Sequence, residues 1–228
     1  MYKKFLKWVR GVVNFYPAIH FSQDGEDIAL AEVFSGKSDG FYVDVGAFHP
    51  SRYSNTYKFY LSGWRGINID ARPDSMRAFR FWRRRDINIE AAISETPTEL
   101  VYHLTSQPAT NSFDAALTQQ RLEKDSSLQL LGKKTIETKR LDALLEAHLP
   151  AGQPIDFLSV DAEGYDLQVL KSNDWSRFSP RLVLVEIYCD SLAEVASSDI
   201  AVYLKNIGYQ PVLKLTRTVI FQEAPKPS

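Results

Sequence analysis

The sequence predicts an α/β fold built on a doubly wound, mostly parallel sheet. Short apolar runs alternate with stretches of helical periodicity, an order that produces parallel strands joined by right-handed crossovers. The clearest expected strands are 41–45, 66–70, 155–161 and 182–187. Two further apolar runs, 212–215 and 218–221, are too close together for a crossover and predict a closing antiparallel hairpin.

Local signals place the remaining elements. Acidic residues at 24–27 before an apolar-periodic segment predict a capped helix start. Ser62-Gly63 ends a helix that begins near Ser54, and Pro73 suits the first turn of a helix that runs to Phe81. The other expected strands are 87–93, 101–104 and 136–139, and the other expected helices are 141–147, 165–170 and 192–207.

Two stretches have a less regular pattern. Residues 105–133 are polar and irregular, and a long irregular segment in a compact domain is often a lid or a binding loop. We therefore expect 107–129, with Asn111 and Phe113, to cover a ligand. Residues 80–85 form an arginine run around Phe81 and Trp82, for which a solvated helix face is the simpler interpretation. A patch for an anionic substrate or a membrane is the alternative.

Size and composition are typical of one globular domain. The chain has 228 residues, of which 44% are hydrophobic and 24% are charged, enough for a buried core. The net charge of −1 gives no general attraction for nucleic acid, so we expect no nucleic-acid partner. The single cysteine, Cys189, excludes an intrachain disulfide and a cysteine-based zinc site, and it suits a cytoplasmic location.

We expect three regions: an N-terminal helical extension over 1–21, the main domain over 22–222 and a tail over 223–228. No apolar run is long enough to span a bilayer. The basic N-terminus has apolar residues that fit one face of a short helix. That face would pack on the domain or make peripheral contact with a membrane.

Two expected strands deliver acidic residues to the same edge of the sheet. Asp44 and Gly46 lie at the end of strand 41–45, and Asp70 ends strand 66–70. Ligands of doubly wound sheets bind at the carboxyl ends of the strands, where Gly46 would allow close approach and Asp70 would bind ribose hydroxyls. The structural alternatives are a turn cap for Asp44 and a helix N-cap for Asp70.

The turn after the first strand lacks the glycines of a dinucleotide site. NAD and FAD sites use Gly-x-Gly-x-x-Gly to hold a pyrophosphate, whereas Phe48 and Pro50 follow Gly46 here. The turn therefore favours a nucleoside ligand without phosphates, such as S-adenosylmethionine. An NAD-dependent Rossmann oxidoreductase is the alternative.

Acidic residues also follow the strand 155–161. Asp161, Glu163 and Asp166 surround Gly164, and such a group of carboxylates is costly unless it is solvated, paired or bound to a ligand. One carboxylate would act as a general base, or two would hold a divalent metal. Helix capping is the structural alternative and explains Asp166 best. His49 is a further candidate base, although a lone histidine is often structural.

Several segments in this order resemble the FkbM-type methyltransferases. They are Val43-Asp44-Val45-Gly46-Ala47, Ile69-Asp70, Ala91-Ala92-Ile93-Ser94 and Phe157-Leu158-Ser159-Val160-Asp161-Ala162-Glu163-Gly164. The resemblance extends from Ser22 to about Glu186. It implies a class I, Rossmann-like methyltransferase fold over 22–222, with a seven-stranded sheet and a C-terminal antiparallel hairpin.

The resemblance also implies S-adenosylmethionine as cofactor and assigns roles by position. Asp44 and Gly46 would lie along its methionine and ribose part, Asp70 would bind the ribose, and Asp161 would lie beside the transferable methyl group. Ser54 and Asn55 would hold the methionine carboxylate. The other implied contacts are Gln23, Ala71, Glu90, Ala91 and Ala92, the last three at the adenine. The family turn is Gly-Ala-Asn-x-Gly, so Phe48-His49-Pro50 predicts a different path here.

Family members are mostly O-methyltransferases of sugars, polyketides and related compounds. The resemblance therefore implies methyl transfer to a hydroxyl of a sugar or glycan-type acceptor, as in polysaccharide biosynthesis. We expect in-line transfer assisted by an acidic base or a metal. A non-catalytic protein that binds an adenosyl ligand is a further alternative, disfavoured by the presence of Asp44, Asp70 and Asp161 together.

Overall fold

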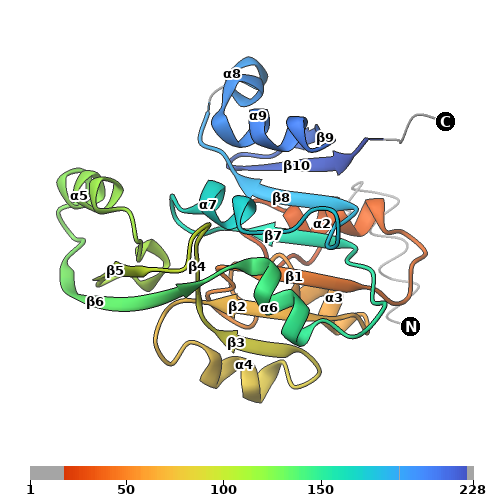
Figure 1. Ribbon diagram of the computed structural model, residues 1–228, viewed down its shortest axis with the longest axis horizontal. Coiled ribbons are helices and arrows are strands. Elements are labelled where there is room, and N and C mark those ends of the chain that lie inside the picture. The colour runs from red at the N-terminus through yellow and green to blue at the C-terminus, as the bar shows by residue number, and fades with distance from the viewer. Residues whose placement is uncertain (1–17, 190, 225–228) are drawn as a thin grey trace, which may run out of the picture.

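A seven-stranded sheet forms the centre of the protein (Figure 1). The computed structural model describes residues 18–189 and 191–224. Strand order is β3-β2-β1-β7-β8-β10-β9, in which β10 is antiparallel to both of its neighbours and the other pairs are parallel. The predicted doubly wound sheet with a C-terminal hairpin is thus confirmed. The strands are β1 (Phe41–Val45), β2 (Arg65–Asp70), β3 (Ile87–Glu90), β7 (Phe157–Val160), β8 (Leu182–Glu186), β9 (Tyr209–Lys214) and β10 (Thr218–Glu223).

Helices cover both faces of this sheet because successive strand residues point to opposite sides. Phe41, Val43 and Val45 of β1 pack in one cluster with α6 (Leu141–His148), α7 (Asp166–Lys171), α8 (Leu192–Ser197) and α9 (Asp199–Asn206). Tyr42 points to the other face and packs with α2 (Glu26–Val33) and α3 (Tyr57–Leu61). The remaining helix of the main domain, α4 (Met76–Trp82), lies beside β3 at the sheet edge (Figure 1).

A smaller sheet of order β4-β6-β5 projects from the main sheet (Figure 1). It consists of β4 (Ala92–Ile93), β5 (Glu99–Thr105) and β6 (Leu130–Lys139). The one-turn helix η1 (Pro108–Thr110) and the helix α5 (Ala115–Lys124) connect β5 to β6. The prediction of an irregular segment over 105–133 was therefore wrong. The Asp114 side chain accepts a hydrogen bond from the backbone N–H of Leu117 at 2.9 Å, and this cap starts α5.

Other boundaries also differ from expectation. The expected strand 87–93 is divided at Ala91 into β3 and β4, which belong to different sheets. The expected helix 192–207 is interrupted at Ser198, whose hydroxyl caps α9. Helix α4 begins at Met76 instead of Pro73. Gly25 precedes α2 in a left-handed conformation and offers no side-chain cap, but the Ser22 hydroxyl accepts a hydrogen bond from the backbone N–H of Asp27 in the first turn, at 3.3 Å.

The expected N-terminal helix and its membrane contact fall on residues 1–17, and most of the expected tail on 225–228, both outside the described residues. In the part of the chain that the structure describes, no helix has the length and apolar character needed to cross a membrane.

Arg83 is fully buried, so the solvated face expected over 80–85 is wrong for this residue, although Arg80, Arg84 and Arg85 are exposed as expected. The Arg83 guanidinium donates hydrogen bonds to the carboxylate of Asp86, the hydroxyl of Tyr42 and the carbonyl of Pro50, at 2.8, 2.7 and 2.9 Å. Asp86 in turn accepts a hydrogen bond from the backbone N–H of Gly66. This network ties α4 to β1, β2 and the loop after β1, and so fixes the loop that follows Gly46.

Gly46 is the point of closest approach between the ends of β1 and β7. It has a left-handed φ of 80°, and a Cβ atom there would collide with the carbonyl oxygen of Asp161. Across the same gap, the backbone N–H of Asp161 donates to the carbonyl of Val45 at 3.0 Å. Only glycine accommodates both the conformation and the contact, so Gly46 sets where Asp161 lies.

Replacing Arg83 by alanine should lower the free energy of unfolding by about 3–5 kcal/mol, because Asp86 would remain buried without its cation. Equilibrium unfolding in urea measures the change. Arg84→Ala, at the exposed neighbouring arginine, serves as control and should change stability by less than about 0.5 kcal/mol. Equal effects of the two substitutions would contradict the buried network.

Gly46→Ala should destabilise the fold by about 1–3 kcal/mol more than Gly25→Ala does. Both glycines have positive φ, so both variants carry the backbone penalty, but a Cβ at Gly25 would meet no atom within 4 Å. The difference between the two unfolding free energies therefore isolates the contact with Asp161. Equal losses would mean that the close approach of Gly46 to Asp161 does not constrain the fold.

Candidate functional site

A cavity of about 430 Å³ opens at the carboxyl ends of β1, β2, β7 and β8. Gly46, Asp70, Asp161 and Glu186 line it, and each lies at or just after the end of one of these strands. The carboxyl edge of a doubly wound sheet is where ligands bind. Other predicted cofactor contacts that line the cavity are Gln23, Ala71 and Ala91.

Asp70 organises the loops after both β1 and β2. Its carboxylate accepts hydrogen bonds from the backbone N–H groups of Phe48 and Arg72, each at 2.8 Å. Burial raises the pKa of Asp70, although both hydrogen bonds oppose that shift. Each carboxylate oxygen retains a further lone pair, so Asp70 can still accept hydrogen bonds from a ligand.

The turn that departs from the family pattern brings an aromatic ring to the cavity. Phe48 has a left-handed φ of 52° and lines the cavity. Its ring is nearly parallel to that of Tyr53, with a centroid distance of 6.2 Å, and Arg52 lies over both rings. The adjacent His49 does not line the cavity. Its Nδ1 accepts hydrogen bonds from the backbone N–H groups of Ser51 and Arg52.

Asp44 lies outside the cavity and is bound within the protein. Its carboxylate accepts a hydrogen bond from the Thr56 hydroxyl at 2.9 Å, and burial raises its pKa to about 6. The Ser54 hydroxyl accepts the backbone N–H of Tyr57 at the start of α3. Asn55 donates to the hydroxyl of Ser159 and borders a smaller adjoining cavity. That cavity shares with the larger one Gln23, Tyr53, Asp161, Glu186 and Arg217.

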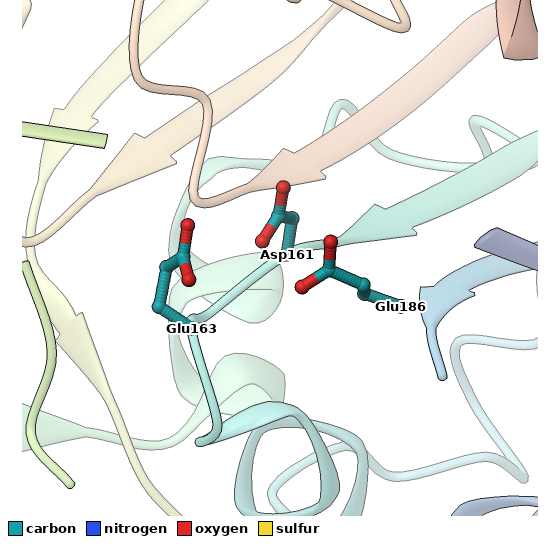
Figure 2. A group of neighbouring side chains, drawn as sticks. All are labelled: Asp161, Glu163 and Glu186. Atoms are coloured by element: carbon teal, nitrogen blue, oxygen red, sulfur yellow. The ribbon is translucent and has the colours of Figure 1, made fainter. Parts of the chain in front are cut away.

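Three carboxylates converge at the end of β7 and β8 (Figure 2). Carboxylate oxygens of Asp161, Glu163 and Glu186 all lie within 4.8 Å of one another. Burial raises all three pKa values, and the negative charge of Glu186 raises the pKa of Asp161 further. The pKa of Glu186 rises to about 7, although a hydrogen bond from the Tyr188 hydroxyl at 2.8 Å opposes the shift. Glu186 therefore exchanges its proton near neutral pH.

The segment between β5 and β6 reaches this cluster. Arg121 of α5 forms an ion pair with Glu163, and the Ser112 hydroxyl donates to the Glu163 carbonyl at 2.7 Å. Glu163 itself has a left-handed φ of 52°. Its partner Arg121 lowers the pKa that burial raises. Helix α5 thus supplies the cation that stabilises one of the three carboxylates.

Aromatic side chains form much of the remaining wall. Phe113 lies between Tyr102 and Tyr165, with ring centroid distances of 4.6 and 5.6 Å, and all three line the cavity together with Tyr188. Of these aromatic residues, Phe113 was predicted from the sequence, as part of the segment 107–129. Tyr102, Tyr165, Tyr188, Arg121 and Glu186 were not. For Glu186 a signal existed, because the aliphatic strand 182–186 ends in an acid as β2 does.

The predicted contacts divide into two groups. The cavity brings together Gln23, Gly46, Asp70, Ala71, Ala91, Asp161 and Glu163. Residues that do not line it are Asp44, His49, Ser54, Asn55, Glu90 and Ala92. Ala92 pairs with Thr138 within the smaller sheet. The Asp166 carboxylate accepts hydrogen bonds from the backbone N–H groups of Ala162 and Gly164, which is the structural role expected for it.

Two polar atoms lack a partner among the described residues and belong to residues that line the cavity. They are Nε of Arg72 and Oδ1 of Asp161, both buried. Buried polar atoms are normally satisfied, so unpaired ones at a cavity fit a ligand with polar groups. An adenosyl ligand with a positively charged sulfur suits this wall, because Asp70 offers acceptors for hydroxyl groups and the three carboxylates offer negative charge.

The sequence and the fold were compared with known proteins. The methyltransferase FkbM domain family matches residues 44–211, which is more than half of the chain. Comparison with curated proteins gave no match. A TehB-like SAM-dependent methyltransferase from Corynebacterium glutamicum is 7% identical, with a TM-score of 0.41 and 97% of each chain covered.

The glycopeptide N-methyltransferase MtfA, solved with S-adenosylhomocysteine, is 10% identical, with a TM-score of 0.38 and coverage of 97% of this chain and 98% of that one. The acids at the strand ends fit both a methyltransferase and an NAD-dependent oxidoreductase, and the family match identifies the methyltransferase. The chain belongs to the FkbM-domain family of S-adenosylmethionine-dependent methyltransferases.

Proposed function

We propose that this protein methylates a hydroxyl group of a sugar or glycan-type acceptor, with the carboxylate cluster as proton acceptor. The proposal rests on the convergence of Asp161, Glu163 and Glu186 beside the cavity, where burial raises all three pKa values, that of Glu186 to about 7. A sugar hydroxyl is a weak nucleophile, and a positioned base with a pKa near the working pH removes its proton most effectively.

Residues of the larger cavity suit the cofactor. When bound, S-adenosylmethionine supplies an electrophilic methyl group on a positively charged sulfur. Asp70 would accept hydrogen bonds from the ribose hydroxyls, and Ala71 and Ala91 would lie at the adenine side. Asn55 and Gln23, at the adjoining smaller cavity, are placed for the methionine end. Gly46 contacts the Asp161 backbone closely and so holds Asp161 at this edge of the sheet.

Asp161 is the preferred base. Its Oδ1 is buried and has no partner among the described residues, whereas Glu163 is paired with Arg121 and Glu186 with the Tyr188 hydroxyl. Asp161 would accept a hydrogen bond from the acceptor hydroxyl and take its proton as the oxygen bonds to the methyl carbon. The methyl–sulfur bond would break in the same step and leave S-adenosylhomocysteine. His49 is the weaker candidate, because its Nδ1 is occupied and its ring lies outside the cavity.

A sugar acceptor fits the aromatic wall of the cavity. Phe113, Tyr165 and Tyr188 line the cavity next to the carboxylates, so apolar ring faces and hydrogen-bond acceptors lie side by side. A pyranose presents the same combination, apolar C–H faces and hydroxyl edges. The segment 107–113, with α5, would cover the acceptor, as expected for 107–129.

A divalent cation at the same cluster is the second candidate. Asp161, Glu163 and Glu186 each offer an oxygen ligand within 4.8 Å of the others, a donor set that suits Mg²⁺ or Mn²⁺. A metal there would acidify the acceptor hydroxyl in place of a base. Activity that disappears on chelation and returns with Mg²⁺ or Mn²⁺ would favour the metal.

The reaction itself is tested with labelled S-adenosylmethionine and pools of nucleotide sugars, oligosaccharides and lipid-linked glycans, followed by mass spectrometry. We expect label on a hydroxyl oxygen of a sugar. Label on nitrogen or carbon, or only on compounds without sugar, would contradict the proposed acceptor class. Heat release with S-adenosylhomocysteine but not with NADH would separate cofactor binding from acceptor choice.

Asp161→Asn should retain S-adenosylhomocysteine affinity within about threefold and reduce the transfer rate by about 10²–10⁴-fold, the usual contribution of a general base. Single-turnover methyl transfer and calorimetric binding measure the two quantities. Asp39→Asn, at an exposed carboxylate, is the control and should change neither. Normal transfer by Asp161→Asn would assign the base elsewhere.

The transfer rate should increase as the pH rises above the pKa of Asp161, because this carboxyl group accepts a proton only after losing its own. Burial and the negative charge of Glu186 raise that pKa well above its ordinary value. In Glu186→Gln one negative charge beside Asp161 is gone. The pKa of Asp161 then falls, and the rising limb of the pH–rate profile should move to lower pH. An unmoved limb in Glu186→Gln would show that the two carboxylates do not titrate together.

A further inference from the structure

Two large aromatic side chains at the end of α4 are exposed side by side. Phe81 and Trp82 have 61% and 62% of their surface accessible, and their rings meet edge to face with a centroid distance of 5.4 Å. The other hydrophobic side of α4, at Met76 and Phe79, is fully buried. The core therefore does not need Phe81 and Trp82, and their exposure calls for another explanation.

Exposed arginines surround this aromatic pair. Arg77, Arg80, Arg84 and Arg85 are all exposed, and none takes part in an ion pair in the described part of the chain. Arg84 lies over the ring of Phe81. The adjacent acid, Asp86, is buried and paired with Arg83. We call the set Arg77, Arg80, Phe81, Trp82, Arg84 and Arg85 the α4 surface; it is cationic on a protein whose net charge is −1.

The α4 surface faces away from the cavity. Helix α4 connects the carboxyl end of β2 to the amino end of β3, so its last residues lie at the amino edge of the sheet. Helix α3 ends at the same edge. The guanidinium of Arg85 bonds to the carbonyl of Tyr60 and stacks on its ring, and the exposed Leu61 follows Tyr60. Contact through this edge would leave the cavity open.

We propose that the α4 surface docks the enzyme on an anionic lipid bilayer. Tryptophan and phenylalanine favour the interface between headgroups and acyl chains, and arginines beside them reach the lipid phosphates. Charge complementarity favours a bilayer over an uncharged partner. Two protruding rings at a helix end suit insertion into a deformable layer, because a protein partner would need a matching pocket. The inference does not depend on the proposed acceptor.

Co-sedimentation of the full chain with vesicles tests the docking surface. We expect binding to vesicles rich in phosphatidylglycerol, little binding to pure phosphatidylcholine and a loss of binding at high salt. Phe81→Ala/Trp82→Ala should weaken binding about tenfold through lost apolar burial. Arg80→Glu/Arg84→Glu should weaken it at least about 25-fold, fivefold for each arginine removed.

Matched controls lie elsewhere on the surface. Leu131→Ala/Leu192→Ala removes two side chains that are 68% and 71% exposed, and Lys133→Glu/Lys134→Glu reverses two exposed cations of β6. Both controls should bind vesicles like the unsubstituted protein. All variants should keep their unfolding midpoint and S-adenosylhomocysteine affinity.

Three results would overturn the proposal. The first is no binding to anionic vesicles, and the second is an equal loss of binding in the α4-surface variants and the control variants. The third is binding to polyglutamate as strong as binding to vesicles, if it requires the arginines but not Phe81 and Trp82. The last outcome would assign the surface to an acidic protein.

Discussion

The crowding of three carboxylates at one edge of the sheet is the constraint on which the site depends. Asp161, Glu163 and Glu186 are held within 4.8 Å, where burial and mutual repulsion disfavour their charged forms. Such an arrangement persists only if other parts of the structure compensate for it. Arg121 of α5 and the hydroxyl of Tyr188 provide that compensation, each to a different member of the cluster.

The two halves of the fold contribute differently to this edge. The parallel strands place the acids, and Gly46 lets β1 pass close enough to β7 to fix Asp161. The segment between β5 and β6 adds the aromatic wall and the balancing cation. On the far side, the buried Arg83 holds α4 and the loop after β1 in place. The crowded carboxylates thus lie on a frame that a satisfied polar network holds in place.

The sequence predicted the main sheet well, because buried strands are continuous apolar runs whose ends carry the informative acids. It failed where tertiary contacts decide. The helix α5 is polar, and its contact between Arg121 and Glu163 joins residues 42 apart in the chain. Arg83 shares a charge run with exposed arginines, and only packing distinguishes it. His49 and Asp44 occupy the right segments, but their hydrogen bonds point away from the cavity.

The most direct measurement is a crystal structure of the protein with S-adenosylhomocysteine. We expect the ribose hydroxyls at the carboxylate of Asp70 and the sulfur beside Asp161, with the aromatic wall left free for the acceptor. Two results would contradict this expectation. One is a ligand whose sulfur points away from Asp161, Glu163 and Glu186. The other is a ligand that binds outside the cavity at the carboxyl ends of β1, β2, β7 and β8.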